Sequence, residues 1–133
     1  MNDPGRDPPM CAGPHLDTRK PKLKLPPKSA DCHCHVFGPA ARFPYSPTRS
    51  YTPPDAGVDD LARLHGRLGL DRAVIVQASC HGTDNAALLD ALRRGGGRYA
   101  GVAMIGDATT DAEVDELHEA GVRGTRVNFV AHL

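Results

Sequence analysis

The sequence predicts an α/β fold, the N-terminal half of a (β/α)8 TIM barrel, preceded by a disordered Pro-rich tail. From residue 30 onward, short apolar runs of strand type alternate with segments of helical period, as in successive strand–helix units on a parallel sheet. A complete barrel takes roughly 250 residues, so four strands within residues 30–133 amount to about half of one. All twelve prolines lie before residue 55, which leaves the remainder free to form helices and central strands.

Two regions are expected, a tail over residues 1–29 and a partial barrel over residues 30–133. The tail combines proline, glycine and charged residues with few large apolar side chains, so it cannot bury a core of its own. The first strand is predicted over residues 31–36. A loop of unusual length, residues 37–55, then leads to the first helix.

The first helix is predicted over residues 58–68, where apolar side chains recur at three- and four-residue spacing and Gly69 helps to end the helix. Residues 72–78 (RAVIVQA) are β-branched and almost continuously apolar, which is typical of a strand buried on both faces of a parallel sheet.

The second helix is expected to begin at a cap formed by Thr83 or Asp84 and to end at the three glycines 95–97. A third strand follows over residues 98–105.

Thr110 and Glu113 have the spacing of a capping box and predict a third helix, which ends at Gly121. The fourth strand is predicted over residues 122–129. Four residues later the chain stops without a helix to cover this strand, so we expect further sequence downstream. The alternative architecture is a minimal four-stranded open α/β sheet.

Composition excludes several classes of function. The formal net charge is zero, so no broad field attracts nucleic acid or an anionic membrane, and no apolar run reaches the roughly 18 residues of a bilayer span. The four cysteines contain no C-x-x-C pair, and the amino terminus does not resemble a secretory signal. We therefore expect a cytoplasmic protein with free thiols.

The segment Asp31-Cys-His-Cys-His35 carries the clearest candidate chemistry. Strand geometry sends His33 and His35 to one face and Cys32 and Cys34 to the other, where the thiols would pack beneath helices. Two imidazoles at the end of the first barrel strand could hold a metal ion or polarise a carbonyl. H-x-H alone is a weak signal, because a single histidine is usually structural. A zinc knuckle of two Cys and two His is disfavoured because the two pairs point in opposite directions.

Side chains in the second strand, the fourth strand and the long loop are further candidates for substrate contacts. In the second strand, Gln77 and Ser79 are interpreted as inward polar groups at its carboxyl end, with Ser79 as a hydrogen-bond donor rather than a nucleophile. Arg126 is expected to point into the barrel, where a carboxylate ligand, or an internal Asp or Glu, would compensate its burial. In the long loop, Tyr51 or Arg49 could line the entrance, although most loop side chains are ordinarily solvent-exposed.

Four segments together carry a family resemblance: DCHCHVFGP, FPYSPTRSYTPPDA, VIVQASCHGTDNAALLDAL and GVRGTRVNFV. They resemble, in order and spacing, the amidohydrolase-related family that contains the 2-pyrone-4,6-dicarboxylate lactonases, from Asp31 to Leu133. The resemblance implies a (β/α)8 barrel that opens a carboxylate-bearing lactone. Water would attack a carbonyl polarised by the first-strand histidines or activated by a divalent ion.

The resemblance also implies roles for individual residues. His33 and His35 match the family's first-strand histidines and would be the ligands of a divalent metal such as Zn²⁺, if one is bound. Ser79 and Arg126 match substrate-carboxylate contacts, and Tyr51 matches a loop tyrosine.

The chain departs from the family pattern at two positions. His132 stands where relatives supply a second arginine, and His81 stands where a hydroxyl residue is expected, which puts a dicarboxylate preference in doubt. A further histidine and the aspartate that acts as general base would lie beyond Leu133, so the chain is expected to be inactive alone.

Two alternatives remain open at this stage. One is a related metal-dependent decarboxylase. The other is a non-catalytic half-barrel that self-associates through its exposed strand edges.

Overall fold

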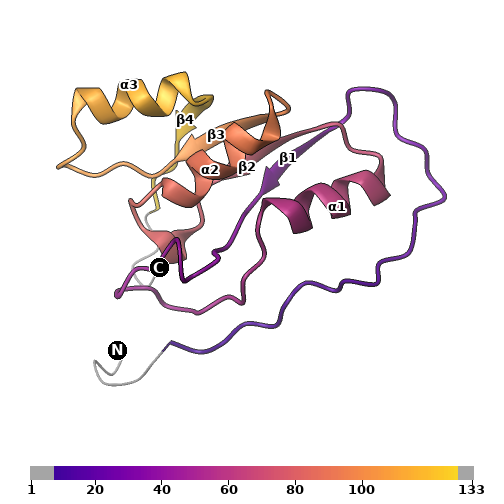
Figure 1. The fold of residues 1–133 in the computed structure, drawn as a ribbon, viewed down its shortest axis with the longest axis horizontal. Helices are drawn as coiled ribbons and strands as arrows, with labels where there is room; N and C mark the ends of the chain where they lie inside the picture. The colour runs from indigo at the N-terminus through magenta and orange to yellow at the C-terminus, as the bar shows by residue number, and fades with distance from the viewer. Residues whose placement is uncertain (1–7, 129–133) are drawn as a thin grey trace.

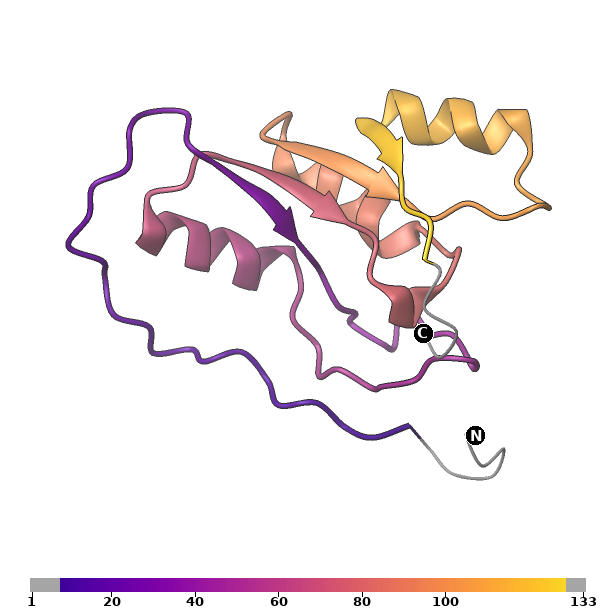
Figure 2. The ribbon, with the colours of Figure 1, turned by 180° about the vertical axis from the view of Figure 1, so that it is seen from behind.

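The computed structural model describes residues 8–128, and its helices and strands follow the predicted alternating order. The elements are β1 (Ala30–Cys34), α1 (Val58–Leu68), β2 (Arg72–Val76), the 3-10 turn η1 (Ser79–His81), α2 (Ala86–Gly95), β3 (Tyr99–Ala103), α3 (Asp111–Glu119) and β4 (Val122–Thr125). The strands pair in parallel in the order β1-β2-β3-β4. The helices cover one face of the sheet, and in the described part of the chain the opposite face carries none (Figures 1 and 2).

Each strand is shorter than its apolar run. The predicted strands 31–36, 72–78 and 98–105 end at Cys34, Val76 and Ala103. The predicted strand 122–129 ends at Thr125, and its last residue lies outside the described residues. The apolar residues that follow β1 and β2, Val36 and Ala78, are buried, whereas Ile105 after β3 and Val127 after β4 are exposed.

Each of the three α-helices carries a capping signal that the sequence predicted. α1 ends at Gly69, which adopts the left-handed conformation with φ of 78°. Thr110 and Glu113 form the predicted capping box of α3, in which the Thr110 side chain accepts a hydrogen bond from the Glu113 backbone N–H. At α2 the N-cap position is Asn85, whose side chain makes no capping hydrogen bond, whereas the predicted Asp84 accepts from the Ala86 N–H at 3.0 Å and so caps the first turn.

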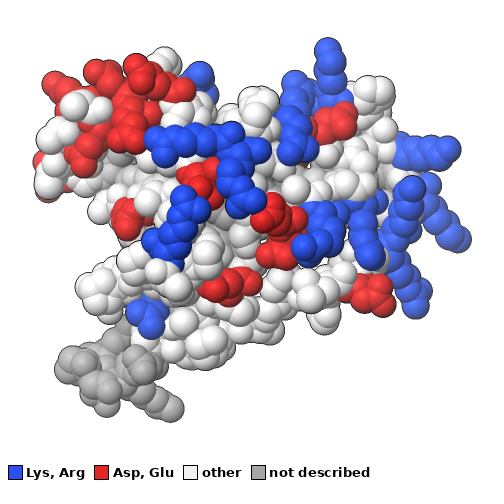
Figure 3. All heavy atoms as spheres, viewed as in Figure 1, with Lys and Arg blue, Asp and Glu red and all other residues white. Residues whose placement is uncertain are grey.

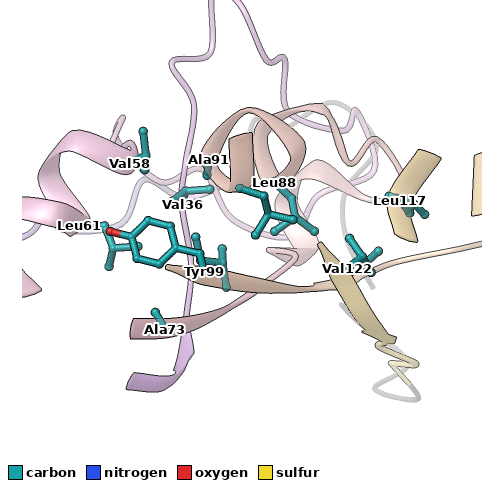
Figure 4. Packing of buried hydrophobic residues seen from close by; sticks show 12 residues of the cluster. Val36, Val58, Leu61, Ala73, Leu88, Ala91, Tyr99, Leu117 and Val122 are labelled. Atoms are coloured by element: carbon teal, nitrogen blue, oxygen red, sulfur yellow. The ribbon is translucent and has the colours of Figure 1, made fainter. Parts of the chain in front are cut away.

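A single apolar core lies between the sheet and its helices (Figure 4). Alternate residues of β2, Ala73 and Ile75, point into it and meet Leu88 of α2, which is fully buried like Ile75. In β3, a side chain at Gly101 would come within 2.7 Å of Leu92, so the glycine lets α2 pack closely onto the sheet.

The Pro-rich segment contains no helix between residues 8 and 29, and it is attached to the domain. Met10 forms a parallel bridge with Thr52, and the Arg67 guanidinium donates to the carbonyl of Thr18. The predicted disorder of the tail in solution stays a prediction.

Charge is balanced over the chain but segregated on the surface. Arg19 and four lysines within residues 20–28 belong to the tail, whereas α3 carries five acidic residues. Figure 3 shows the positive and the negative groups at different ends of the molecule.

Among the described residues, no helix has both the length and the apolar character to cross a bilayer.

The core predicts that alanine substitutions at two leucines differ clearly in their effect on the free energy of unfolding. We expect Leu88→Ala, which removes a fully buried side chain, to lower the free energy of unfolding by about 2–5 kcal/mol. Leu64→Ala is the matched control on α1, where the side chain is 38% exposed, and it should cost much less. Urea unfolding followed by circular dichroism measures both, and equal losses would contradict this description of the core.

Candidate active site

The two histidines of the first strand lie together at its carboxyl end. The ring centroids of His33 and His35 are 5.0 Å apart in an edge-to-face arrangement, with His33 exposed and His35 half-buried. His35 follows the last residue of β1, so it stands at the edge of the sheet where the loops begin. The structure thus brings both predicted imidazoles to one location.

A backbone contact fixes the orientation of His35. Its Nδ1 lies 2.8 Å from the carbonyl oxygen of Val76 at the end of β2. Burial, with the nearby positive charges of His33 and Arg126 adding to it, lowers the pKa of His35 below its ordinary value of 6.5. A neutral His35 that donates through Nδ1 presents the lone pair of Nε2 to a ligand.

Tyr51 and Ser79 form a second pair of functional groups. The Tyr51 hydroxyl lies 3.2 Å from the Ser79 hydroxyl, although the two residues come from the long loop and from the first position of η1. Burial raises the pKa of Tyr51, so its phenol stays protonated and can serve as a donor. The structure brings these predicted residues together.

Arg126 leaves the end of β4 and reaches toward β2. Its backbone N–H donates to the Ala103 carbonyl at 2.7 Å, and its guanidinium donates to the Gln77 carbonyl at 3.2 Å. Within residues 8–128, Arg126 makes no ion pair with a carboxylate. The alternative of an internal Asp or Glu partner is therefore not observed in the described part of the chain.

The prediction that Gln77 points into the barrel is wrong. Its side chain is buried at 2% exposure and donates to the carbonyls of Gly82, at 3.1 Å, and Asp84, at 2.7 Å. Gln77 therefore continues the face of Ile75, which the helices cover, and it holds the turn after η1. A strand that is apolar on both faces gives no periodic signal to tell the inner face from the outer.

The strict alternation predicted for the first strand also fails at one position. Cys34 packs against the core as expected, but Cys32 is exposed. Pairing of β1 with β2 shifts register between Asp31 and Cys34, and this irregularity breaks the period of two.

Two other residues predicted to contact substrate are not part of the observed site. Arg49 is occupied within its own loop, where Nε donates to the Thr52 hydroxyl at 2.9 Å and a terminal nitrogen donates to the Ser46 carbonyl at 3.2 Å. His132 lies outside the described residues.

His81 supports the site in a way that sequence reasoning missed. Its Nε2 accepts a hydrogen bond from the Gly38 N–H at 3.4 Å, and its Nδ1 lies 3.3 Å from the Pro44 carbonyl. Burial lowers the pKa of His81, which favours the neutral ring that can accept and donate at once. His81 thus ties η1 to the long loop that carries Tyr51.

The tail forms one wall of a cavity next to His35, a contact that the sequence did not indicate. A cavity of about 400 Å³ is lined by His35, Phe37 and Tyr51 together with residues 11–14. The backbone N–H of Thr52 donates to Pro9 at 2.8 Å and its carbonyl accepts from Cys11 at 2.9 Å, so the tail is fastened beside Tyr51. No local periodicity could have revealed this contact, because it joins segments about 40 residues apart.

Comparison with known proteins shows which family the chain belongs to. A family model described as Amidohydrolase matches residues 30–133. The chain belongs to the amidohydrolase family. The match begins at the first residue of β1 and excludes the tail.

Individual amidohydrolases agree with this assignment. The chain is 52% identical over 119 residues to a 2-pyrone-4,6-dicarboxylate hydrolase of Comamonas testosteroni, covering 90% of this chain and 39% of the relative. It is 39% identical to a 4-sulfomuconolactone hydrolase of Hydrogenophaga intermedia, covering 91% of this chain and 40% of the relative. The chain thus spans about two fifths of the length of these curated relatives.

A solved structure supports the fold. A probable 2-pyrone-4,6-dicarboxylic acid hydrolase of Acinetobacter baumannii, crystallised with citric acid, superposes with a TM-score of 0.69 at 30% identity. The superposition covers 75% of this chain and 37% of the other. These comparisons confirm the predicted fold class, half of a (β/α)8 barrel.

The environments of His35 and His81 predict that the fold becomes less stable in acid. Because the pKa values of His35 and His81 are lowered in the fold, the unfolded chain binds more protons just below pH 6.5. Their stabilising contribution is present above about pH 6.5 and is lost as the pH falls through the lowered folded values. We expect the free energy of unfolding, measured in urea between about pH 7.5 and 5.5, to decrease.

His81→Gln removes one of these titrations and should flatten the pH dependence. His15→Gln, in the exposed tail, is the matched control and should keep the dependence of the parent chain. An identical pH slope in His81→Gln would show that His81 does not contribute.

Proposed function

We propose that this chain supplies one side of the active site of a hydrolase that opens a carboxylate-bearing lactone by attack of water on the ring carbonyl. The observation that carries the proposal is the convergence of His33, His35 and Arg126 at the carboxyl edge of the sheet. In barrel enzymes this edge is where catalytic groups gather. It lies beside a cavity large enough for a small ring compound.

The histidines are proposed to act on the carbonyl. His35 is held by Val76 with Nε2 directed away from that contact, and His33 stands beside it and is open to solvent. A hydrogen bond from the His33 ring, or an ion held by both rings, would stabilise the negative charge that develops on the carbonyl oxygen during attack. The Tyr51 and Ser79 hydroxyls would orient the substrate through hydrogen bonds.

Arg126 is proposed to recognise the substrate carboxylate. Its planar guanidinium can bind two carboxylate oxygens at once, and within residues 8–128 it has only a backbone carbonyl as hydrogen-bond acceptor. A carboxylate ligand would therefore complete its hydrogen bonding and balance its charge.

A divalent ion such as Zn²⁺ fits the histidine pair as two of its ligands. The Nδ1 contact of His35 with a backbone carbonyl is the outer contact that metal-bound imidazoles usually make. The ion would polarise the carbonyl or activate water, and its other ligands would come from outside residues 8–128. The proposed roles of Tyr51, Ser79 and Arg126 do not depend on whether such an ion is bound.

The substrate class is inferred from the relatives. Two of them are described as hydrolases of 2-pyrone-4,6-dicarboxylate and of 4-sulfomuconolactone, both cyclic esters that carry acidic groups. We extend to this chain the same class of substrate and a cytoplasmic location. The general base is expected from the part of the relatives' length that this chain does not span.

The test uses residues 1–133 joined to the remaining part of the Comamonas testosteroni relative, with hydrolysis of 2-pyrone-4,6-dicarboxylate followed by absorbance. His35→Ala should lower kcat about 10²–10⁴-fold, because it removes a group that acts on the reacting carbonyl. His15→Ala, in the exposed tail, should retain activity. Full activity of His35→Ala would rule out the proposed role.

Arg126→Lys tests carboxylate recognition in the same protein. Loss of a bidentate contact worth about 1.5 kcal/mol should raise KM roughly tenfold. Arg123→Lys is the matched control in β4, three residues before Arg126, because Arg123 is exposed and donates to the His118 and Val122 carbonyls. Equal KM values for the two variants would contradict the role of Arg126.

Self-association is a second candidate, favoured by the open sheet edges. β1 pairs only with β2 and β4 only with β3 in the described part of the chain, so each leaves an unpaired backbone edge. We expect the 133-residue chain to scatter light as a dimer or larger species. A monomeric mass at all concentrations would exclude this candidate.

A further inference from the structure

Three potential metal ligands meet on the other side of β1 from the histidine pair. Asp31, Cys34 and His65 each place one donor atom within 4.8 Å of the others. Cys34 packs against the core beneath the helices, and His65 belongs to the buried face of α1. The group therefore lies between strand and helix and shares no residue with the proposed active site.

The irregular pairing of β1 with β2 explains why Asp31 and Cys34 lie on the same side of the strand. In a regular strand, residues 31 and 34 would face opposite sides, because their spacing is odd. The register shift between Asp31 and Cys34 allows both side chains to turn toward α1. The Asp31 carboxylate also accepts a hydrogen bond from the His33 N–H at 3.0 Å, which holds it in place.

The His65 ring is incompletely satisfied in this position. It is 3% exposed, and Nε2 lies 3.3 Å from a carboxylate oxygen of Asp31. Its Nδ1 is buried and has no hydrogen-bond partner within the described residues. Buried polar atoms nearly always have partners, and among the hydrogen bonds of the described residues the only one that orients this ring is the contact between Nε2 and Asp31.

We propose that Asp31, Cys34 and His65 form a structural site for a Zn²⁺ ion that joins α1 to β1. Imidazole nitrogen, thiolate sulfur and carboxylate oxygen are all ligands that Zn²⁺ takes. On binding, the Cys34 S–H bond breaks, the sulfur keeps the electron pair as it bonds to the ion, and the proton passes to water.

The geometry requires only a small adjustment. Tetrahedral bonds of about 2.0–2.3 Å set donor atoms roughly 3.5 Å apart, and the Asp31–His65 contact of 3.3 Å already meets this spacing. The Cys34 sulfur lies within 4.8 Å of the other two donor atoms and would leave the Val74 carbonyl, 3.6 Å away, to reach the ion. The Asp31 side chain is 29% exposed, so the carboxylate meets solvent, and water would be the fourth ligand.

The experiment is a titration of the 133-residue chain with Co²⁺, which reports its ligands by absorbance. We expect a thiolate-to-cobalt charge-transfer band and tetrahedral visible bands that saturate at one equivalent, and both should disappear when Zn²⁺ is added. Zn²⁺ should also raise the Tm of the unmodified chain, because it binds the folded state. Absence of the band together with an unchanged Tm would overturn the proposal.

Variants locate the ligands. Cys34→Ser and His65→Asn should each lose the charge-transfer band or weaken Co²⁺ binding at least tenfold, whereas Cys32→Ser, at the neighbouring exposed thiol, should behave like the parent chain. His33→Gln should also retain the band. A band that survives Cys34→Ser, or binding that is lost only in His33→Gln, would place the metal elsewhere.

Discussion

Parallel pairing of the four strands determines where the candidate site residues of this chain lie. Each strand of a parallel sheet ends at the same edge, so the segments after β1, β2 and β4 bring His35, Ser79 and Arg126 to one edge although they are far apart in sequence. The helices bury the other side of the same strands. The core fixes the positions of the backbone, and the loops then need only to orient a few side chains.

Local signals allowed the sequence to predict the order and type of every strand and α-helix. Gly69 and the Thr110–Glu113 box mark helix ends through contacts within one turn, so they can be recognised without knowledge of the fold. The orientation of Gln77 could not be predicted, because β2 is apolar on both faces. The exposure of Cys32 could not be predicted either, since it depends on how β1 pairs with its neighbour.

In the candidate site, too, contacts within one strand could be predicted from the sequence, whereas contacts between distant segments could not. That His33 and His35 share a face follows from the strand period, and the structure places their rings side by side. The contacts of Tyr51 with Ser79 and of His81 with Gly38 join segments 28 and 43 residues apart. No spacing rule encodes such contacts. They arise from how the long loop folds back over the ends of the strands.

The bridge between Met10 and Thr52 gives the amino-terminal segment a part in the environment of the site. Two backbone hydrogen bonds hold this segment against the residue that follows Tyr51, and residues 11–14 face the same cavity as His35. Backbone pairing of this kind tolerates many side chains but is sensitive to insertion, deletion and added proline. A change of backbone length within a stretch whose composition resembles a dispensable linker would therefore reach the neighbourhood of Tyr51.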